Sequence, residues 1–135
     1  MTTGSWDPST QTSSIDVSID PALLNRFIAL VQADAIGDLS SSMSEEDKRQ
    51  NSLMQADTPS WQTALADHSD EHLIALIRFF TVVEMQLPNW VGGAKSPVIS
   101  INKLLRSRGQ KLDRDMLLWI KANSDNRFIP NGSPL

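Results

Sequence analysis

The stretch LIALIRFFTVVEMQL, residues 73–87, predicts the central helix of the fold. With about 100° of rotation per residue, apolar side chains cover half of this helix, and Gln86 is the only polar residue among them. An apolar arc this wide is typical of a helix that other elements cover on several sides. The run is too short, and too interrupted by Arg78 and Glu84, to span a bilayer. We therefore expect a buried helix at the centre of the protein.

Capping residues followed by proline divide the remaining chain into further helices. Asp20-Pro21, Thr58-Pro59 and Ser96-Pro97 each place a capping side chain directly before a proline, which is the pattern of a helix start. Gly37 is expected to end the first of these helices. Additional helices are predicted near residues 44–56 and 113–124. The sequence thus predicts an all-α, single-domain bundle of five or six helices around residues 73–87, with a C-terminal helical hairpin over residues 97–124.

The composition fits one globular domain, because 135 residues with 40% apolar and 21% charged side chains can bury a single core. We assign residues 1–19, which are rich in Ser, Thr, Asp and Gly, to a flexible N-terminal tail in which Trp6 has no assigned role. Residues 20–135 form the predicted helical domain. The absence of cysteine excludes disulfides, thiolate metal sites and cysteine nucleophiles. Because no apolar run follows basic residues near the N-terminus, we expect a cytoplasmic protein.

The net charge of −4 conceals an asymmetry between the two parts of the chain. Residues 1–87 hold four Lys or Arg and thirteen Asp or Glu, whereas residues 88–135 hold eight and three. The two parts therefore carry net charges of −9 and +5. Such a division suggests either an acidic partner for the second part or an association of the two parts with each other. A polarised, solvated surface without a partner would have the same composition.

The cations after Pro88 suggest a binding face. We predict a non-enzymatic binding or regulatory module that engages an acidic protein or nucleic-acid surface through this face; no membrane partner is expected, and a homo-oligomer is left open. Lys103 and Arg106 would orient the partner, an exposed Ile99 would add apolar contact, and Trp90 would anchor the edge of the preceding loop. The predicted partner-binding residues are Lys95, Ile99, Lys103, Arg106, Arg108, Lys111, Arg114 and Trp90.

The first alternative is a DNA- or RNA-binding protein that uses the hairpin of residues 97–124. The turn around Gly109 has the length that a helix-turn-helix motif uses, and the nearby cations could neutralise phosphates. The second helix, however, begins with Asp113 and Asp115, which repel phosphate. It continues as MLLWI, residues 116–120, a run that looks buried rather than available to a groove.

The loop before the helix at Pro97 is a candidate anion site. Its backbone amides, a lysine and a capping serine could surround a phosphate or a carboxylate. The spacing is not that of a Walker A loop, because AKS replaces GKS and a helix precedes the loop instead of a strand. A tight turn between two helices would need the same glycines. The predicted anion-binding residues are Gly92, Gly93, Lys95 and Ser96.

Signals for metal binding and for catalysis are weak. His68 and His72 have the spacing of two ligands on one helix face, but no third ligand is evident and capping signals place His68 outside the helix. The second alternative function is a small enzyme or anion-binding protein that uses Arg78, Glu84 and the 92–96 loop. A structural role for Arg78, bonded to loop carbonyls or to Asp34, competes with it. We therefore predict no catalytic residues, no metal and no cofactor.

Overall fold

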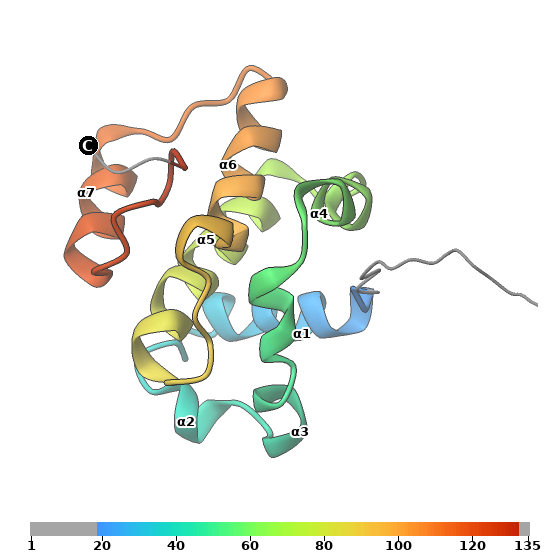
Figure 1. Ribbon diagram of the computed structural model, residues 1–135, viewed down its shortest axis with the longest axis vertical. Helices are drawn as coiled ribbons and strands as arrows, with labels where there is room; N and C mark the ends of the chain where they lie inside the picture. The colour runs from blue at the N-terminus through green and yellow to red at the C-terminus, as the bar shows by residue number, and fades with distance from the viewer. Residues whose placement is uncertain (1–18, 133–135) are drawn as a thin grey trace, which may run out of the picture.

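The computed structural model describes residues 19–132, which are helical with no β-strand (Figure 1). The predicted all-α bundle is confirmed, with seven α-helices in the described range rather than five or six. The helices are α1 (Pro21–Gln32), α2 (Leu39–Ser42), α3 (Glu45–Lys48), α4 (Thr58–Leu65), α5 (Asp70–Gln86), α6 (Pro97–Ser107) and α7 (Arg114–Asn123), with 3₁₀ helices η1 (Asn51–Gln55) and η2 (Gly93–Lys95). The predicted tail, residues 1–19, lies outside the described range except for Ile19, which packs against the core; Trp6 is among the residues that are not described.

Helix α5 occupies the centre of the bundle, and α1, α6 and α7 all pack against it. Its buried face continues the apolar pattern of the sequence, and its aromatic residues form the middle of the core. Phe79 stacks on Phe27 of α1 with ring centroids 3.9 Å apart, and Phe80 meets the same ring edge-on at 5.8 Å. Stacked and edge-to-face aromatic contacts add to the free energy of burial. The α5 sequence therefore specifies both its own burial and the position of α1.

Gln86, the polar residue in the apolar face of α5, connects the helix to the segment after α1. Its amide nitrogen donates to the Ile36 carbonyl at 2.8 Å, and its amide oxygen accepts from the Leu39 backbone N–H at 2.7 Å. Both hydrogen-bonding ends of the side chain are thus satisfied by backbone groups, as partly buried polar groups require. The side chain fixes the path of the chain between α1 and α2.

Two helix boundaries differ from the prediction for reasons of local chemistry. Asp34, rather than Gly37, ends α1: it adopts the left-handed conformation with φ 56°, and the Ala35 N–H donates to the Leu30 carbonyl at 2.9 Å. Asp and Asn tolerate this conformation better than most residues. Asp57, rather than Thr58, caps α4 by accepting from the Ser60 N–H at 3.0 Å. The caps predicted at Asp20 and Ser96 are present.

The polar stretch after Gly37 does not form the single surface helix predicted near residues 44–56. Met43 is extended, with ψ 144°, and separates α2 from α3, while residues 51–55 form η1. The sparse apolar residues in this stretch supply no continuous apolar stripe, so separate short turns bury Leu39, Met43, Leu53 and Met54 individually.

After α7 ends, the C-terminal segment turns back and runs between α7 and α6 (Figure 1). The Asn102 side chain of α6 donates to the Pro130 carbonyl at 3.1 Å, and Ile129 is buried. Helices α6 and α7 follow one another as predicted, but each makes its principal contact with α5. Within residues 19–132, no helix combines the length and the apolar character that a bilayer span requires.

Candidate basic interaction surface

Ion pairs are unevenly distributed over the described residues. Arg26 pairs with Asp47 at 2.9 Å, Lys48 with Glu45 at 2.6 Å, and Arg108 with Asp70 at 2.8 Å. All three carboxylates belong to the acidic part of the chain, residues 1–87. Within residues 19–132, seven of the eight cations after Pro88 form no ion pair. These seven are Lys95, Lys103, Arg106, Lys111, Arg114, Lys121 and Arg127.

Six of these cations line three clefts that share one residue of the C-terminal segment. Asn131 lines three neighbouring clefts, and each cleft has two of the cations among its lining residues. We call this set the C-terminal basic surface. It consists of Lys95 and Lys103 in the first cleft, Arg106 and Lys111 in the second, and Lys121 and Arg127 in the third.

The first cleft lies between α6, the start of α4 and η2, and has a volume of about 380 Å³. Lys95 and Lys103 share it with Asp57, the cap of α4. Hydrogen bonds from Ser60 lower the pKa of Asp57, and the positive charge of Lys95 contributes further. The Asp57 carboxylate thus caps α4, and its single negative charge offsets only part of the positive charge of Lys95 and Lys103 in the first cleft.

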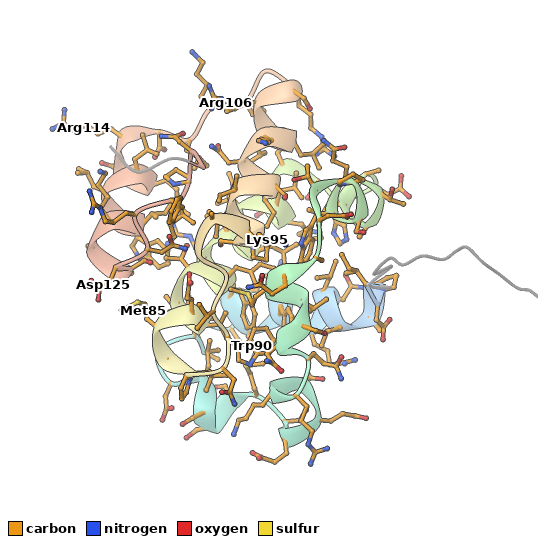
Figure 2. All side chains as sticks on the ribbon, in the orientation of Figure 1. Met85, Trp90, Lys95, Arg106, Arg114 and Asp125 are labelled. Atoms are coloured by element: carbon orange, nitrogen blue, oxygen red, sulfur yellow. The ribbon has the colours of Figure 1, made fainter. Side chains whose placement is uncertain are left out.

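The second cleft is the smallest, about 190 Å³, and lies at the far end of α6. Arg106 and Lys111 line it together with the buried Asn102, whose amide is occupied by the Pro130 carbonyl. Arg114 is exposed at the start of α7, and Figure 2 shows it at the same end of the molecule as Arg106, with Lys95 nearer the middle. The unpaired cations therefore extend along the molecule rather than gathering at one point.

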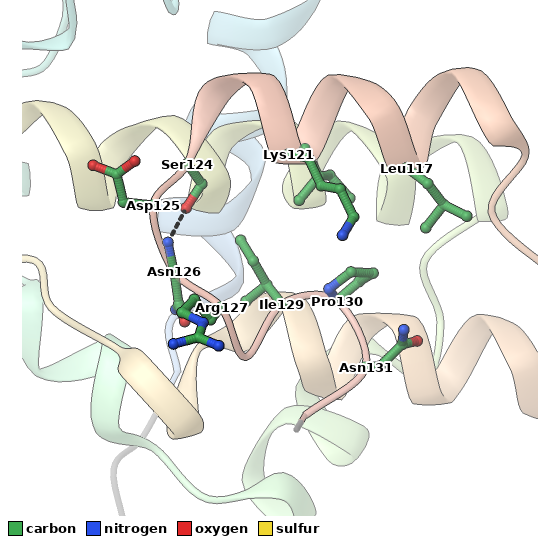
Figure 3. A pocket seen from close by; sticks show the side chains of 10 residues that line it. Leu117, Lys121, Ser124, Asp125, Asn126, Arg127, Ile129, Pro130 and Asn131 are labelled. Carbon is green, nitrogen blue, oxygen red and sulfur yellow. Dashed lines mark hydrogen bonds between the residues drawn. The ribbon is translucent and has the colours of Figure 1, made fainter. Parts of the chain in front are cut away.

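The third cleft, of about 330 Å³, lies between α7 and the returning C-terminal segment. Figure 3 shows Leu117 and Lys121 projecting from α7 towards Pro130 and Asn131. Asp125 is its one carboxylate among the lining residues. A hydrogen bond from the Asn126 N–H to the Ser124 hydroxyl, 3.0 Å long, shapes the turn that brings Arg127 back to this cleft.

The structure separates the predicted partner-binding residues into two groups. Lys95, Lys103, Arg106, Lys111 and Arg114 are exposed, whereas Arg108 is bound by the protein itself. The Arg108 guanidinium donates to the carbonyls of His68 and Ala66 as well as to Asp70, and so ties the end of α6 to the junction of α4 and α5.

Two apolar residues of the predicted face are buried. The prediction of an exposed Ile99 is wrong: its side chain is 6% exposed and faces the C-terminal segment, where Gly132 approaches closely. Trp90 is 1% exposed, packs edge-on against Phe27, and donates its indole N–H to the Lys48 carbonyl at 3.0 Å. Trp90 therefore anchors its loop to the core and not to an outside surface.

Sequence reasoning did not select Lys121 and Arg127. Both belong to the cations after Pro88, but they are separated along the chain from the cluster at residues 95–114. They join the surface because the segment after α7 reverses direction. The apolar pair Phe128 and Ile129 was the available signal for this reversal, since it indicated that the tail packs on the body.

The amides of the predicted anion-binding loop already hold a carboxylate of the same chain. Gly92 and Gly93 both donate their N–H groups to Oε2 of Glu84, at 3.0 and 3.1 Å. The Asn126 side chain donates to Oε1 of Glu84 and to the Gly93 carbonyl, both at 3.0 Å. The loop thus has the anion-binding geometry expected of consecutive amides, and Glu84 satisfies it. Ser96 caps α6, and Lys95 faces solvent.

A side chain at Gly92 would disrupt this arrangement. An added Cβ would lie 2.8 Å from the Cα of Ser96, which is backbone and cannot rotate away. Gly92 is therefore required by the close approach of the chain to itself, and not by an external ligand.

The remaining chemical candidates do not converge. Arg78 and Glu84 are about 120° apart around α5, and Arg78 lies over the Trp119 ring at 4.9 Å while Glu84 binds the loop. His68 and His72 have ring centroids 6.1 Å apart, and the described residues include no cluster of three potential metal ligands. Burial, followed by repulsion from His72, lowers the pKa of His68.

Comparisons of the chain with protein-family models, with curated proteins and with solved structures gave no match. The functional assignment therefore depends on the geometry and charge described above.

Proposed function

We propose that this protein is a non-enzymatic, cytoplasmic binding module whose C-terminal basic surface engages an acidic surface of another protein. The observation that carries the proposal is the placement of six cations, none in an ion pair within residues 19–132, around three clefts that meet at Asn131. Among residues 19–132, Asp57 and Asp125 are the only carboxylates that line these three clefts. A surface with this excess of positive charge attracts and orients an acidic partner.

The shape of the surface supports a macromolecular partner. The three clefts are shallow neighbours and do not form one deep cavity, and the apolar groups beside them, Leu117 and Pro130, belong to different elements. Side chains of acidic residues can enter such clefts individually while the rim stays hydrated. Interfaces of this type gain association rate and specificity from charge more than from buried apolar area.

Nucleic acid is the second candidate, and the position of Arg114 favours it. Arg114 extends the positive charge from Arg106 of the C-terminal basic surface along one end of the molecule (Figure 2), as phosphate contacts along a strand would require. Base reading by α7 is disfavoured, because Asp113 caps this helix and Met116 and Ile120 are buried against the body. Contact with the phosphate backbone would therefore be independent of sequence.

The test compares two double variants that remove the same charge from different places. K103Q/R106Q alters the C-terminal basic surface, while K48Q/R49Q removes two cations from α3 and its cap. Binding to poly-L-glutamate and to a DNA duplex is measured at low and at physiological salt. We expect wild-type protein and K48Q/R49Q to bind poly-L-glutamate alike, and K103Q/R106Q to bind at least about tenfold more weakly.

Each other outcome has a defined meaning. If wild-type protein binds neither polyanion at low salt, or if both double variants lose binding equally, the proposed surface is wrong. Binding to the duplex alone, with a steep dependence on salt, would assign the surface to nucleic acid instead of protein.

A further inference from the structure

Arg78 differs from Arg26 and Arg108, the two arginines that form ion pairs within the described residues. Arg26 makes two hydrogen bonds to Asp47, and Arg108 makes three to Asp70 and to backbone carbonyls. Within the described residues, the Arg78 guanidinium has no ion pair and no hydrogen bond, and it lies over the face of Trp119 with 4.9 Å between its Cζ and the ring centroid. The predicted bonds from Arg78 to Asp34 or to loop carbonyls are not formed.

The guanidinium borders a cleft of about 480 Å³ between α1, α5 and α7. This volume falls within the range of small-molecule sites, about 300 to 1,000 Å³. Val31, Ile36 and Val82 supply apolar walls, and Trp119 supplies both a wall and the support for Arg78. Gln86 also lines the cleft, but its two hydrogen-bonding ends are occupied by Ile36 and Leu39, so it holds the wall in place.

Asp34 gives the cleft a second polar end. Its left-handed conformation ends α1 and places it among the lining residues, yet it is not in an ion pair with Arg78. The cleft therefore has an unpaired cation and a carboxylate that do not neutralise each other directly. Asp34 repels anionic groups, so the cleft favours a ligand whose single anionic group lies at Arg78 over a ligand with a second anionic group near Asp34.

We propose that this cleft binds a small organic monocarboxylate with an apolar body, held by Arg78. The planar guanidinium can form two parallel hydrogen bonds with a carboxylate. Stacking on Trp119 already restricts the Arg78 side chain, so binding costs it little further conformational freedom. The apolar body contacts Val31, Ile36 and Val82. The site is independent of the C-terminal basic surface, because Trp119 is two residues from both Leu117 and Lys121 and so faces away from them on α7.

The test uses benzoate as the probe and benzamide as its neutral analogue of the same shape. Chemical shifts of the Trp119 indole N–H, the Gly37 backbone N–H and the Asn123 side-chain amide, which border the cleft, are followed during titration of the ¹⁵N-labelled protein. We expect saturable shifts with benzoate, at least about tenfold weaker binding of benzamide, and loss of benzoate binding in R78Q. The matched control R114Q, which alters an exposed arginine outside the cleft, binds benzoate like wild type.

A second variant blocks the cleft without touching the arginine. Gly37 lines the cleft, an added Cβ there meets no atom within 4 Å, and its φ is not positive, so the backbone accepts a leucine at the edge of the cleft. We expect G37L to weaken benzoate binding even if R78Q proves unstable. Equal binding of benzoate and benzamide, unchanged binding in G37L, or no shifts up to the solubility limit of benzoate would overturn the proposal. Inorganic phosphate binding more tightly than benzoate would also overturn the assignment to an organic acid.

Discussion

The two parts of the chain use their charges differently. In the part before Pro88, Asp47 and Asp70 hold arginines, and Glu84 and Gln86 hold backbone groups of loops. In the part after Pro88, Arg108 is fixed by such contacts, while the C-terminal basic surface is not paired within the described residues. Polar side chains of the first part thus stabilise the fold through contacts within the protein, whereas the C-terminal basic surface makes no ion pair within residues 19–132. Substitutions in the two regions should accordingly affect different measurements.

The largest loss of stability is expected in the aromatic core. Phe79 is fully buried and stacked on Phe27, so F79A should lower the free energy of unfolding by about 3–5 kcal/mol. Urea unfolding followed by circular dichroism measures this change. K103M, on the exposed face of α6, serves as the control and should stay within about 0.5 kcal/mol of wild type. Similar unfolding free energies for F79A and K103M would contradict the role of the aromatic core in stability.

Glu84 tests whether the loop at residues 92–93 is held from within. E84A leaves the Gly92 and Gly93 amides without their acceptor and should cost about 1–3 kcal/mol of unfolding free energy. Hydrogen exchange at these two amides should accelerate by more than the global loss of stability accounts for. E46A, at an exposed glutamate of α3, is the matched control. Unchanged exchange at Gly92 and Gly93 in E84A would exclude the proposed role of Glu84.

Arg108 and Lys103 provide the sharpest contrast, since both are cations of the C-terminal part and lie five residues apart, Lys103 within α6 and Arg108 at its end. R108M removes three hydrogen bonds at a partly exposed site and should cost about 1–2 kcal/mol, whereas K103M costs little. Poly-L-glutamate binding should respond in the opposite way: K103M should weaken it more than R108M does. If R108M lost binding while keeping wild-type stability, Arg108 would belong to the binding surface after all.

The smallest expected effect concerns pH. Burial and His72 lower the pKa of His68 below its ordinary value of 6.5, so the unfolded chain takes up a proton at this residue before the folded protein does. Unfolding free energy therefore falls as the pH drops from 6.5 through the lower folded pKa. In H68N the difference in unfolding free energy between about pH 7.5 and about pH 5 should be smaller than in wild type. An equal or larger difference would contradict the burial of a neutral His68.

The sequence predicts local structure here better than it predicts which groups meet. The apolar arc of residues 73–87 and the caps at Asp20 and Ser96 depend on neighbours in the chain, and these features are present. Glycines 92 and 93 correctly indicated amides suited to an anion. The anion, however, is Glu84 of the preceding helix, and this pairing follows from the sharp turn after Pro88 rather than from a motif.

The exposure of single residues was harder to predict. Ile99 was expected to be exposed, because nothing in residues 97–108 reveals that the C-terminal segment covers α6. The same reversal of the chain brings Lys121 and Arg127 to the basic surface. Both errors arise from one long-range contact, between α6 and residues 129–132, that helix periodicity does not encode.

The most direct test of the proposed basic surface is to map poly-L-glutamate binding on the ¹⁵N-labelled protein. The Asn131 side-chain amide lies where the three clefts meet and is the central reporter. We expect the shifts to concentrate at Asn131 and at the residues of the surrounding clefts, and to leave α1–α3 unchanged. Shifts that avoid Asn131, or that follow α1–α3 equally, would contradict the account.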